Sequence, residues 1–332
     1  MNSKVYIIIL NFNGHHDTIE CLESLYKLSH HNTQIIVIDN SKTGESLNQI
    51  KLWALGDSYK EVPTCHKRIV YPLQPKPIKF KIISQKESES NFYDEPLLII
   101  KAEENRGFSA GNNIGLRYAQ RKNDFEYCWI LNNDTVVEKD SLTKQILFFR
   151  ENIERKIGIL GSKLIYYDNP KEIQAIGGKF NSTFMVSSPI GAGKERKTKK
   201  SQLGLIDYVV GASMLVSVRF LKEVGLLSED YFLYYEELDW VYRAKDKGWA
   251  IDWCEDSIVH HKEGVSIGTS SNYKARSFFS EVHTFKSRKI FVKKHKLNKS
   301  IFYISSVLII FNRVRRFQFK LANALLKELL ND

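Results

Sequence analysis

Three polar residues, Asn132, Asn133 and Asp134, directly follow the apolar run YCWIL. Such a run predicts a buried strand, and in an open parallel sheet the side chains that follow the strands converge on a ligand. Asp134 is the only anion of the three, and its carboxylate suits Mg²⁺ or Mn²⁺, hard ions that are commonly shared with substrate phosphates. Asn132 is expected to supply a neutral oxygen or to act through water. We therefore expect Asp134 to hold a divalent metal ion against a diphosphate.

Polar clusters also follow three other predicted strands, as NFNG at 11–14, DNSKTG at 39–44 and ENRGFSAGNN at 104–113. Asn, Asp and Gly are common in any turn or helix cap, so each cluster alone has a structural explanation. Four clusters at one sheet edge favour a shared crevice. Within them, Asp39 either accepts hydrogen bonds from a nucleobase or ribose, or caps a helix.

The segment NRGFSAGNN has the features of a phosphate-binding helix start. Gly107 and Gly111 permit close backbone approach, and a helix that begins near Ser109 offers N–H groups to an anion. Arg106 adds positive charge to the same place. The alternative is a glycine turn in which Ser109 caps the helix.

Apolar strands alternate with helical patterns through the first 150 residues. Strands predicted at 4–10, 34–39, 96–102 and 127–132 precede helices at about 16–26, 45–54, 109–120 and 139–152, respectively. This alternation predicts an α/β protein with a parallel sheet, and short glycine-punctuated strands after residue 157 predict a mixed second half. The stretch at about 55–96 holds five of the seven prolines and reads as an inserted loop or an added edge strand.

The composition indicates what kind of partner the protein binds and in which cellular compartment it is expected. A formal charge of +11 indicates an anionic partner, and four scattered cysteines without a CxxC pair suggest neither a zinc site nor a disulfide framework. Reduced cytosol is the expected compartment, since the amino terminus lacks the cleavage site of a signal peptide. No GxGxxG follows the first strand, which removes the main support for a dinucleotide dehydrogenase.

Much of the excess positive charge lies between Lys286 and Lys327. The apolar stretch 301–311 within this region is too short to cross a bilayer. A following helix is expected to place Val314, Phe317, Leu321 and Leu325 on one face and Arg313, Arg316, Lys320 and Lys327 on another. Such a basic amphipathic helix either lies in an anionic membrane interface or packs its apolar stripe on the domain.

The segment YFLYYEELDWVYRAKDKGW predicts a helix with Glu236, Glu237 and Asp239 in its first turn. Acidic side chains in the first turn interact favourably with the helix dipole, and this interaction alone could account for their presence. Helical spacing puts Glu236 and Asp239 on one face and Glu237 on nearly the opposite side from Asp239. The adjacent pair His260 and His261 follows another predicted strand, at 251–259.

Taken in order, the motifs ILNFNG, IDNS, ENRGFSAGNNIGLRYA, WILNNDTVV, VVGASML, YYEELDW and HHKEGVS resemble the inverting family 2 glycosyltransferases, especially their rhamnosyltransferase-like branch. The resemblance is collinear from about residue 4 to 295, apart from the stretch at 55–96. It implies a GT-A fold over 1–295, with a Rossmann-like nucleotide-sugar-binding half at 1–135 and an acceptor-binding half at 136–295. A C-terminal helical segment, 296–332, follows.

The resemblance also implies roles for individual residues. The family's Asp-x-Asp metal motif aligns with Asn132, Asn133 and Asp134, so the first acid is replaced by Asn. Its Glu-Asp pair aligns with Glu236 and Glu237, which makes Glu237 the expected general base, with Asp239 as runner-up. His261 is the expected metal or diphosphate contact and His260 a packing residue. The predicted donor-binding residues are Asn11, Asn13, Asp39, Asn105, Arg106, Gly107, Gly111, Asn112, Asn132, Asn133, Gly211 and Ala212.

The implied reaction is transfer of a sugar from a nucleoside-diphosphate sugar, dTDP-rhamnose or a UDP-sugar, with inversion and with Mg²⁺ or Mn²⁺. The expected acceptor is a bacterial surface glycan, such as an O-antigen or a capsule, on a lipid carrier at the cytoplasmic face of the inner membrane. Two alternatives stay open: a sugar nucleotidyltransferase, and a noncatalytic basic protein that binds nucleic acid. The first does not need the acidic helix, and the second lacks a recognised RNA or DNA motif, so no nucleic-acid partner is expected.

Overall fold

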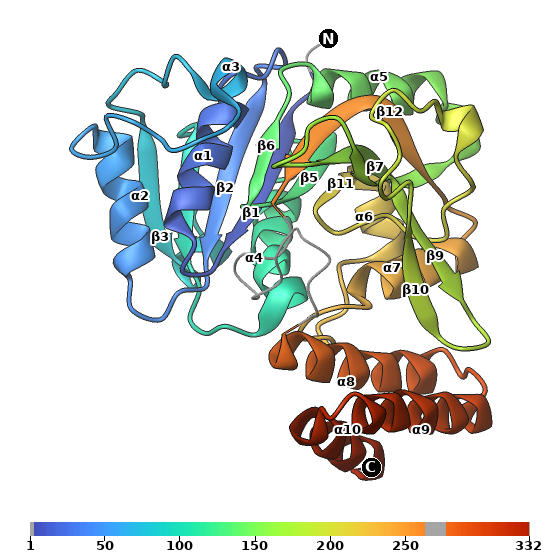
Figure 1. Cartoon of the computed structure of the whole chain (residues 1–332). Helices are drawn as coiled ribbons and strands as arrows, with labels where there is room; N and C mark the ends of the chain where they lie inside the picture. The colour runs from blue at the N-terminus through green and yellow to red at the C-terminus, as the bar shows by residue number, and fades with distance from the viewer. Residues whose placement is uncertain (1–2, 263–276, 332) are drawn as a thin grey trace.

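The computed structural model describes residues 3–262 and 277–331. These residues form one ten-stranded sheet with the strand order β3-β4-β2-β1-β5-β11-β7-β12-β6, and β8 pairs with β7 beside this path (Figure 1). The strands of the sheet are β1 (Val5–Asn11), β2 (Thr33–Asp39), β3 (Phe80–Ser84), β4 (Leu97–Lys101), β5 (Tyr127–Asn132), β6 (Thr135–Val137), β7 (Ile157–Tyr166), β8 (Ile173–Ala175), β11 (Ser213–Ser217) and β12 (Ala250–His261).

The five strands β3, β4, β2, β1 and β5 are parallel, so their carboxyl ends share one edge. The register sets Asn11 opposite Asp39 and Leu10 opposite Asn132. Three of the predicted polar clusters therefore begin at neighbouring positions. Of the two alternatives for residues 55–96, the structure shows an added edge strand, β3, preceded by the short helix α3 (Lys67–Val70).

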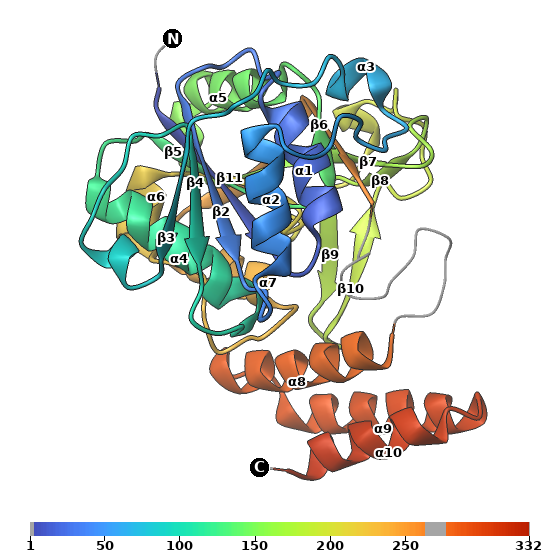
Figure 2. The same cartoon turned by 90° about the vertical axis from the view of Figure 1, so that its left-hand side faces the viewer.

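Helices cover both faces of the sheet, because alternate residues of β1 are apolar on both sides. Val5, Ile7 and Ile9 pack in one core cluster, whereas Tyr6 and Ile8 pack in another. Figures 1 and 2 show the helices of the first half on opposite faces of the sheet. The first cluster includes α1 (His15–Leu25), α2 (Glu45–Leu55) and α5 (Ser141–Glu151), and the second includes α4 (Gly107–Lys122), α6 (Val218–Val224) and α7 (Glu236–Asp246).

The second half continues the same sheet with a change of direction. Strand β11 is antiparallel to both β5 and β7, while β12 is parallel to β7 and antiparallel to β6. The mixed central sheet expected from the sequence is confirmed. A hairpin of β9 (Gly177–Asn181) and β10 (Val186–Ile190) extends toward the C-terminal helices (Figure 1).

The C-terminal residues fold into α8 (Phe278–Lys294), α9 (Lys299–Arg315) and α10 (Phe319–Leu330), which lie beside one another below the sheet (Figures 1 and 2). They share a small core with Met185 from the β9-β10 hairpin. Among the described residues, no helix is long and apolar enough to cross a bilayer.

The single amphipathic helix expected across residues 313–327 is wrong. The chain turns at Phe317, which takes a φ of 56°, so α9 and α10 are separate helices. Only Leu321 and Leu325 of the expected apolar stripe are buried, whereas Val314 and Phe317 are exposed. The stripe is interrupted because α10 folds back to reach the core shared with α8.

Candidate functional site

Asn11 and Asp39 lie side by side at the carboxyl edge of the parallel strands. Asn11 Nδ2 donates to Asp39 Oδ1 at 2.7 Å and to Ser46 Oγ at 2.8 Å, and its Oδ1 accepts from Thr18 Oγ1 at 2.9 Å. Asn11 is therefore a buried tie between strands and helices. Asp39 is also buried, yet its Oδ2 has no hydrogen-bond partner among the described residues. That oxygen is the feature of this pair that suits a ligand's N–H or O–H.

Asn13 lies at the exposed start of the turn after β1. Its φ of 54° is in the left-handed region, and its backbone N–H donates to Ser41 Oγ at 2.8 Å. This contact joins the NFNG and DNSKTG clusters. The expected convergence of these two segments is present in the structure.

The helix after ENRGFS begins at Gly107, two residues before its predicted start at Ser109. Ser109 is therefore not a helix cap, and it lies fully buried within the helix. Gly107 N–H donates to Asn105 Oδ1 at 3.0 Å, and Phe108 N–H donates to Phe232 O at 2.9 Å. Two of the N–H groups expected to meet phosphate are thus used by the protein itself.

The two glycines of this segment serve packing in the structure. A Cβ at Gly107, whose φ is +90°, would overlap the carbonyl of Phe232, and one at Gly111 would overlap Leu10 and lie 2.9 Å from Asn40 Nδ2. Each glycine allows α4 to approach a neighbouring segment of the chain. The space that the sequence suggested for phosphate is filled by protein atoms at both positions.

Arg106 and Asn112 flank the same helix start. The Arg106 side chain is 57% exposed and pairs with Glu104 at 3.5 Å and Glu229 at 3.4 Å. Asn112 is buried and donates to Phe108 O at 3.0 Å, while its Oδ1 has no hydrogen-bond partner among the described residues. Because Arg106 is exposed and its ion pairs are long, it is able to turn toward an anion.

Asp134 and His261 lie in contact just beyond the carboxyl end of β5, with Asp134 Oδ1 3.2 Å from His261 Nε2. Strand pairing brings them together, since His261 of β12 pairs with Thr135 of β6. Asn132 Nδ2 lies 3.4 Å from the same imidazole nitrogen. Asn133 points elsewhere and donates to Thr18 Oγ1 at 3.0 Å and to Gly14 O at 3.3 Å, so it braces α1.

Gln174 of β8 fixes the orientation of His261. Gln174 Nε2 donates to the His261 carbonyl at 3.2 Å, which leaves Gln174 Oε1 to accept from His261 Nδ1 at 2.7 Å. Nδ1 then carries the proton and Nε2 faces the Asp134 carboxylate, where a proton or a cation stabilises the pair. Sequence reasoning missed Gln174, because a lone Gln in a short strand gives no signal.

The donor set at this place fits a divalent metal ion that is shared with a substrate. Among residues 3–262 and 277–331, no group of three or more His, Cys, Asp or Glu side chains is arranged to hold a metal. Asp134 and His261 together supply one carboxylate and one imidazole, and Mg²⁺ sites commonly complete such a partial set with water and phosphate oxygens. Asp134 is therefore the expected protein anion of a shared site.

His260 and Lys262 flank His261 and hold the end of β12. His260 is buried, with its Nε2 3.1 Å from Glu138 Oε1, in agreement with a packing role. Lys262 pairs with Asp17 at 2.6 Å and Glu20 at 2.5 Å, and its N–H donates to Asp134 O at 3.0 Å. The EGVS part of the HHKEGVS motif, residues 263–266, lies outside the described residues.

Glu237 is held by the backbone at Gly211. Gly211 N–H donates to Glu237 Oε1 at 3.1 Å, and a Cβ at Gly211 would overlap that oxygen. The next residue, Ala212, accepts from Asn132 N–H at 3.1 Å. This chain of contacts brings the acidic helix beside the strand end that carries Asp134. Burial raises the pKa of Glu237.

Glu236 is the more deeply buried of the two glutamates. Its side chain is 2% exposed, its Oε2 has no hydrogen-bond partner among the described residues, and burial together with the charge of Glu237 raises its pKa well above the usual range. The helix is entered through Tyr234 and Tyr235, both with a φ of 70°. Left-handed backbone at non-glycine residues costs about 1–2 kcal/mol each, and such strain tends to gather at functional sites.

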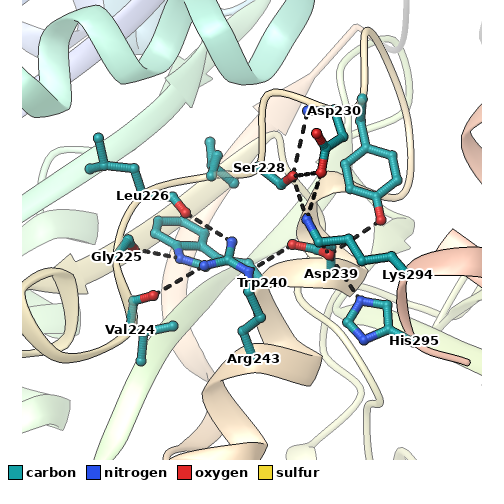
Figure 3. Close-up of polar contacts among 12 residues, drawn as sticks. Val224, Gly225, Leu226, Ser228, Asp230, Asp239, Trp240, Arg243, Lys294 and His295 are labelled. Atoms are coloured by element: carbon teal, nitrogen blue, oxygen red, sulfur yellow. Dashed lines mark hydrogen bonds and ion pairs between the residues drawn. The ribbon is translucent and has the colours of Figure 1, made fainter. Parts of the chain in front are cut away.

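Asp239 lies in a buried ion-pair cluster that joins α7 to α8 (Figure 3). Its carboxylate meets Arg243 Nε at 2.8 Å, His295 Nε2 at 2.9 Å, Lys294 Nζ at 3.2 Å and Tyr231 Oη at 3.2 Å. Although burial alone would raise it, the hydrogen bonds from His295 and Arg243 lower the pKa of Asp239 to about 2. A carboxylate held in this way is a weak base with a structural role.

Known proteins share sequence similarity with this chain. Residues 81–225 match the family model described as Glycosyl transferase family 2. The chain is 27% identical over 164 residues to the low-salt glycan biosynthesis hexosyltransferase Agl10 of Haloferax volcanii, covering 48% of this chain and 50% of that protein. It is 26% identical over 213 residues to the rhamnosyltransferase WbbL of Escherichia coli, covering 60% of this chain and 76% of that protein. The match thus spans half the length of Agl10.

Solved structures share the fold at low sequence identity. GalNAc-T7, crystallised with UDP, GalNAc and Mn²⁺, gives a TM-score of 0.56 at 14% identity and covers 87% of this chain and 48% of that one. The mannosyltransferase PcManGT from Pyrobaculum calidifontis, in complex with GDP-Man and Mn²⁺, gives a TM-score of 0.51 at 12% identity. This match covers 98% of this chain and 75% of that one. The predicted GT-A fold is confirmed. Residues 81–225 thus match glycosyl transferase family 2, and the fold of the described residues is similar to that of these two structures.

Proposed function

We propose that this protein is a metal-assisted inverting glycosyltransferase that moves a sugar from a nucleoside-diphosphate sugar to a saccharide acceptor. The observation that carries the proposal is the contact chain from Glu237 through Gly211 and Ala212 to Asn132. It brings a carboxylate with a raised pKa beside the Asp134 and His261 pair. One group suits proton transfer, and the other suits a diphosphate-bound cation.

Glu237 is the proposed general base. With Oε1 fixed by Gly211 N–H, Oε2 takes the proton of the acceptor hydroxyl as that oxygen attacks the anomeric carbon. The bond to the nucleoside diphosphate breaks on the opposite face, so one displacement inverts the anomeric configuration. General-base assistance of this kind contributes about 10² to 10⁴ in rate. Asp239 is not proposed as the base, because its pKa is lowered to about 2.

Asp134 and His261 are the proposed holders of Mg²⁺ or Mn²⁺. When bound, the ion neutralises charge that grows on the leaving diphosphate. His261 is positioned for this by Gln174, and Asp134 by strand pairing. The Mn²⁺ in the GalNAc-T7 and PcManGT structures supports a divalent ion.

Asp39 is the proposed anchor of the nucleoside, because its Oδ2 is an open acceptor among the described residues at the strand edge. The similarity to WbbL supports dTDP-rhamnose as donor, and a UDP-sugar is the second choice. The names of both curated relatives support a glycan acceptor. We place this acceptor on a lipid carrier in bacterial surface polysaccharide synthesis, with the protein peripheral on the cytoplasmic face of the inner membrane.

A thermal-shift screen of sugar nucleotides with and without Mn²⁺ tests the donor and the metal together. A ligand that binds the native state raises the melting temperature. Asp134→Ala should lose the metal-dependent part of the shift, while the control Asp57→Ala, at an exposed position, should keep it. A full shift in Asp134→Ala would remove Asp134 from the metal site.

Turnover tests the base and the reaction class. Wild-type protein should release nucleoside diphosphate in the presence of acceptor, whereas a nucleotidyltransferase would release pyrophosphate. Glu237→Gln should keep the donor-induced thermal shift and lose turnover by at least about 10²-fold. The control Glu154→Gln, at an exposed position, should be unchanged. Turnover retained in Glu237→Gln would exclude this residue as the base.

A further inference from the structure

Helix α9 packs Phe302 inward but carries a second set of apolar side chains on the outside. Ile304, Val307, Leu308 and Phe311 recur at helical spacing and are 63%, 56%, 57% and 63% exposed. The buried residues of the same helix are Phe302 and two serines, Ser305 and Ser306. A surface helix ordinarily leaves polar side chains on its outer side, with its apolar stripe toward the core. We call the four exposed residues the α9 outer face.

Arg288 of α8 holds α9 in this orientation. Its guanidinium is 2% exposed and donates to Ser306 Oγ at 3.2 Å, to Ser305 Oγ, and to Phe184 O of the hairpin at 3.1 Å. Turning the outer face inward would strand this buried cation in apolar surroundings, at a large energetic cost. The exposure of the outer face is therefore fixed by a specific polar contact.

The surroundings of the outer face are strongly basic. Residues 282–327 contain twelve Lys and Arg and no Asp or Glu. Lys296 and Lys299 are exposed before and at the start of α9, and Arg315 and Arg316 are exposed at its end, close to the exposed side chain of Phe317. Large exposed apolar patches mark interaction sites, and positive charge around one selects an anionic partner.

These observations favour a lipid surface over the other candidates. A second copy of the chain would bring the same positive charge to the contact and would be repelled. A nucleic acid would match the charge but would leave the aliphatic side chains in water. An anionic bilayer suits both the apolar side chains and the positive charge. The apolar side chains enter the boundary of the acyl chains, while Lys and Arg contact the headgroups.

We propose that the α9 outer face, with the basic residues at both ends of α9, binds the protein to the surface of an anionic lipid bilayer. The helix lies on the bilayer without crossing it. In Figure 1 the three C-terminal helices lie at the end of the sheet that holds the carboxyl ends of the parallel strands. A lipid-linked acceptor would therefore approach the proposed site from the membrane side.

The inference builds on the membrane-bound acceptor of the proposed function, but its test needs neither donor nor turnover. Full-length protein is floated with vesicles of phosphatidylcholine alone, or with about 30% phosphatidylglycerol added to supply negative charge. Wild-type protein should float with the anionic vesicles and much less with the neutral ones. Binding should weaken as salt is raised.

Two pairs of variants make the test specific. Leu308→Gln with Phe311→Gln should lower the partition constant by at least about tenfold, because two large apolar side chains no longer leave water. The matched control, Ile153→Gln with Leu205→Gln, changes two exposed apolar residues outside α8–α10 and should bind as wild type does. Arg315→Glu with Arg316→Glu should also weaken binding by about tenfold or more, unlike the equal charge change Lys51→Glu with Lys60→Glu.

Three outcomes would overturn the proposal. The first is equal flotation of the α9 variants and their controls. The second is a dimer by light scattering that Leu308→Gln with Phe311→Gln converts to monomer, without vesicle binding, which would make the outer face a contact between copies. The third is retention on random RNA without vesicle binding. Release of nucleoside diphosphate in solution, measured on the same variants, shows separately whether the proposed chemistry stands.

Discussion

Replacing Gly211 with Ala tests whether Glu237 must sit where the backbone holds it. An added Cβ would overlap Glu237 Oε1 and lie 3.2 Å from Cδ and 3.3 Å from Cγ, so the whole carboxylate has to move. To regain an ordinary contact distance the oxygen must shift by about 1 Å. The same shift breaks the hydrogen bond from Gly211 N–H. A misplacement of about 1 Å at a reacting group can lower the rate by about 10²-fold.

We therefore expect Gly211→Ala to lower kcat by about 10²-fold while KM for the donor changes little. Gly211 has no positive φ, so alanine is compatible with the backbone there. Gly204→Ala is the matched control, because no atom lies within 4 Å of the added Cβ, and it should keep full kcat. Release of nucleoside diphosphate gives kcat, and thermal melting confirms that both variants are folded.

The double variant with Glu237→Gln decides whether the two residues act together. If Gly211→Ala acts only through the base, it should add almost no loss once Glu237 is replaced. The reasoning would be refuted if the fold-losses in kcat of the two single variants multiplied in the double variant. It would also be refuted if kcat of Gly211→Ala stayed within about threefold of wild type.

The remaining predictions concern charge. Asp239→Asn should lower the free energy of unfolding by about 3 kcal/mol near neutral pH, because the side chains of Arg243 and Lys294 lose their buried anion; urea unfolding measures this, and Asp246→Asn, exposed on the same helix, should change it little. The pKa of Asp239 in the folded protein is lowered to about 2, so its contribution to the free energy of unfolding is fully present above about pH 4 and should fade as the pH falls toward 2. If the stability difference between wild type and Asp239→Asn persists unchanged at pH 2, the ion-pair account is contradicted. Burial raises the pKa of Glu237, so kcat/KM should fall on acidification through a pKa above the usual value of about 4.3 for glutamate; a profile that stays flat down to pH 4 would show that this carboxylate is not the base.

The fold of the first half was predictable because its signals are local. Apolar runs bounded by Asn, Asp and Gly fixed the strands, and their alternation with helical patterns predicted a parallel sheet whose edge collects the polar clusters. The contact between Asp134 and His261 could not be predicted from local signals alone, because it depends on the pairing of β6 with β12, which are far apart in the sequence. The resemblance of HHKEGVS to the family pattern supplied that link.

Two features show where local signals fail. The helical period continues across Phe317 without a Gly or Pro to mark a break, so the turn between α9 and α10 was invisible. Gly211 was predicted only as a donor-binding residue, and its contact with Glu237, 26 residues away, was not foreseen. In both cases the deciding contact is tertiary and leaves no trace in spacing or composition.

The position of β11 has a consequence for how the chain is made. Strand β5 pairs on one side with β1 and on the other with β11, whose residues 213–217 emerge about 80 residues later during synthesis. Until then the nascent chain carries an open apolar strand edge, a template for pairing with other chains. A fragment that ends near residue 150 should therefore aggregate, and pulse-labelled translation intermediates of that length should need a chaperone to remain dispersed.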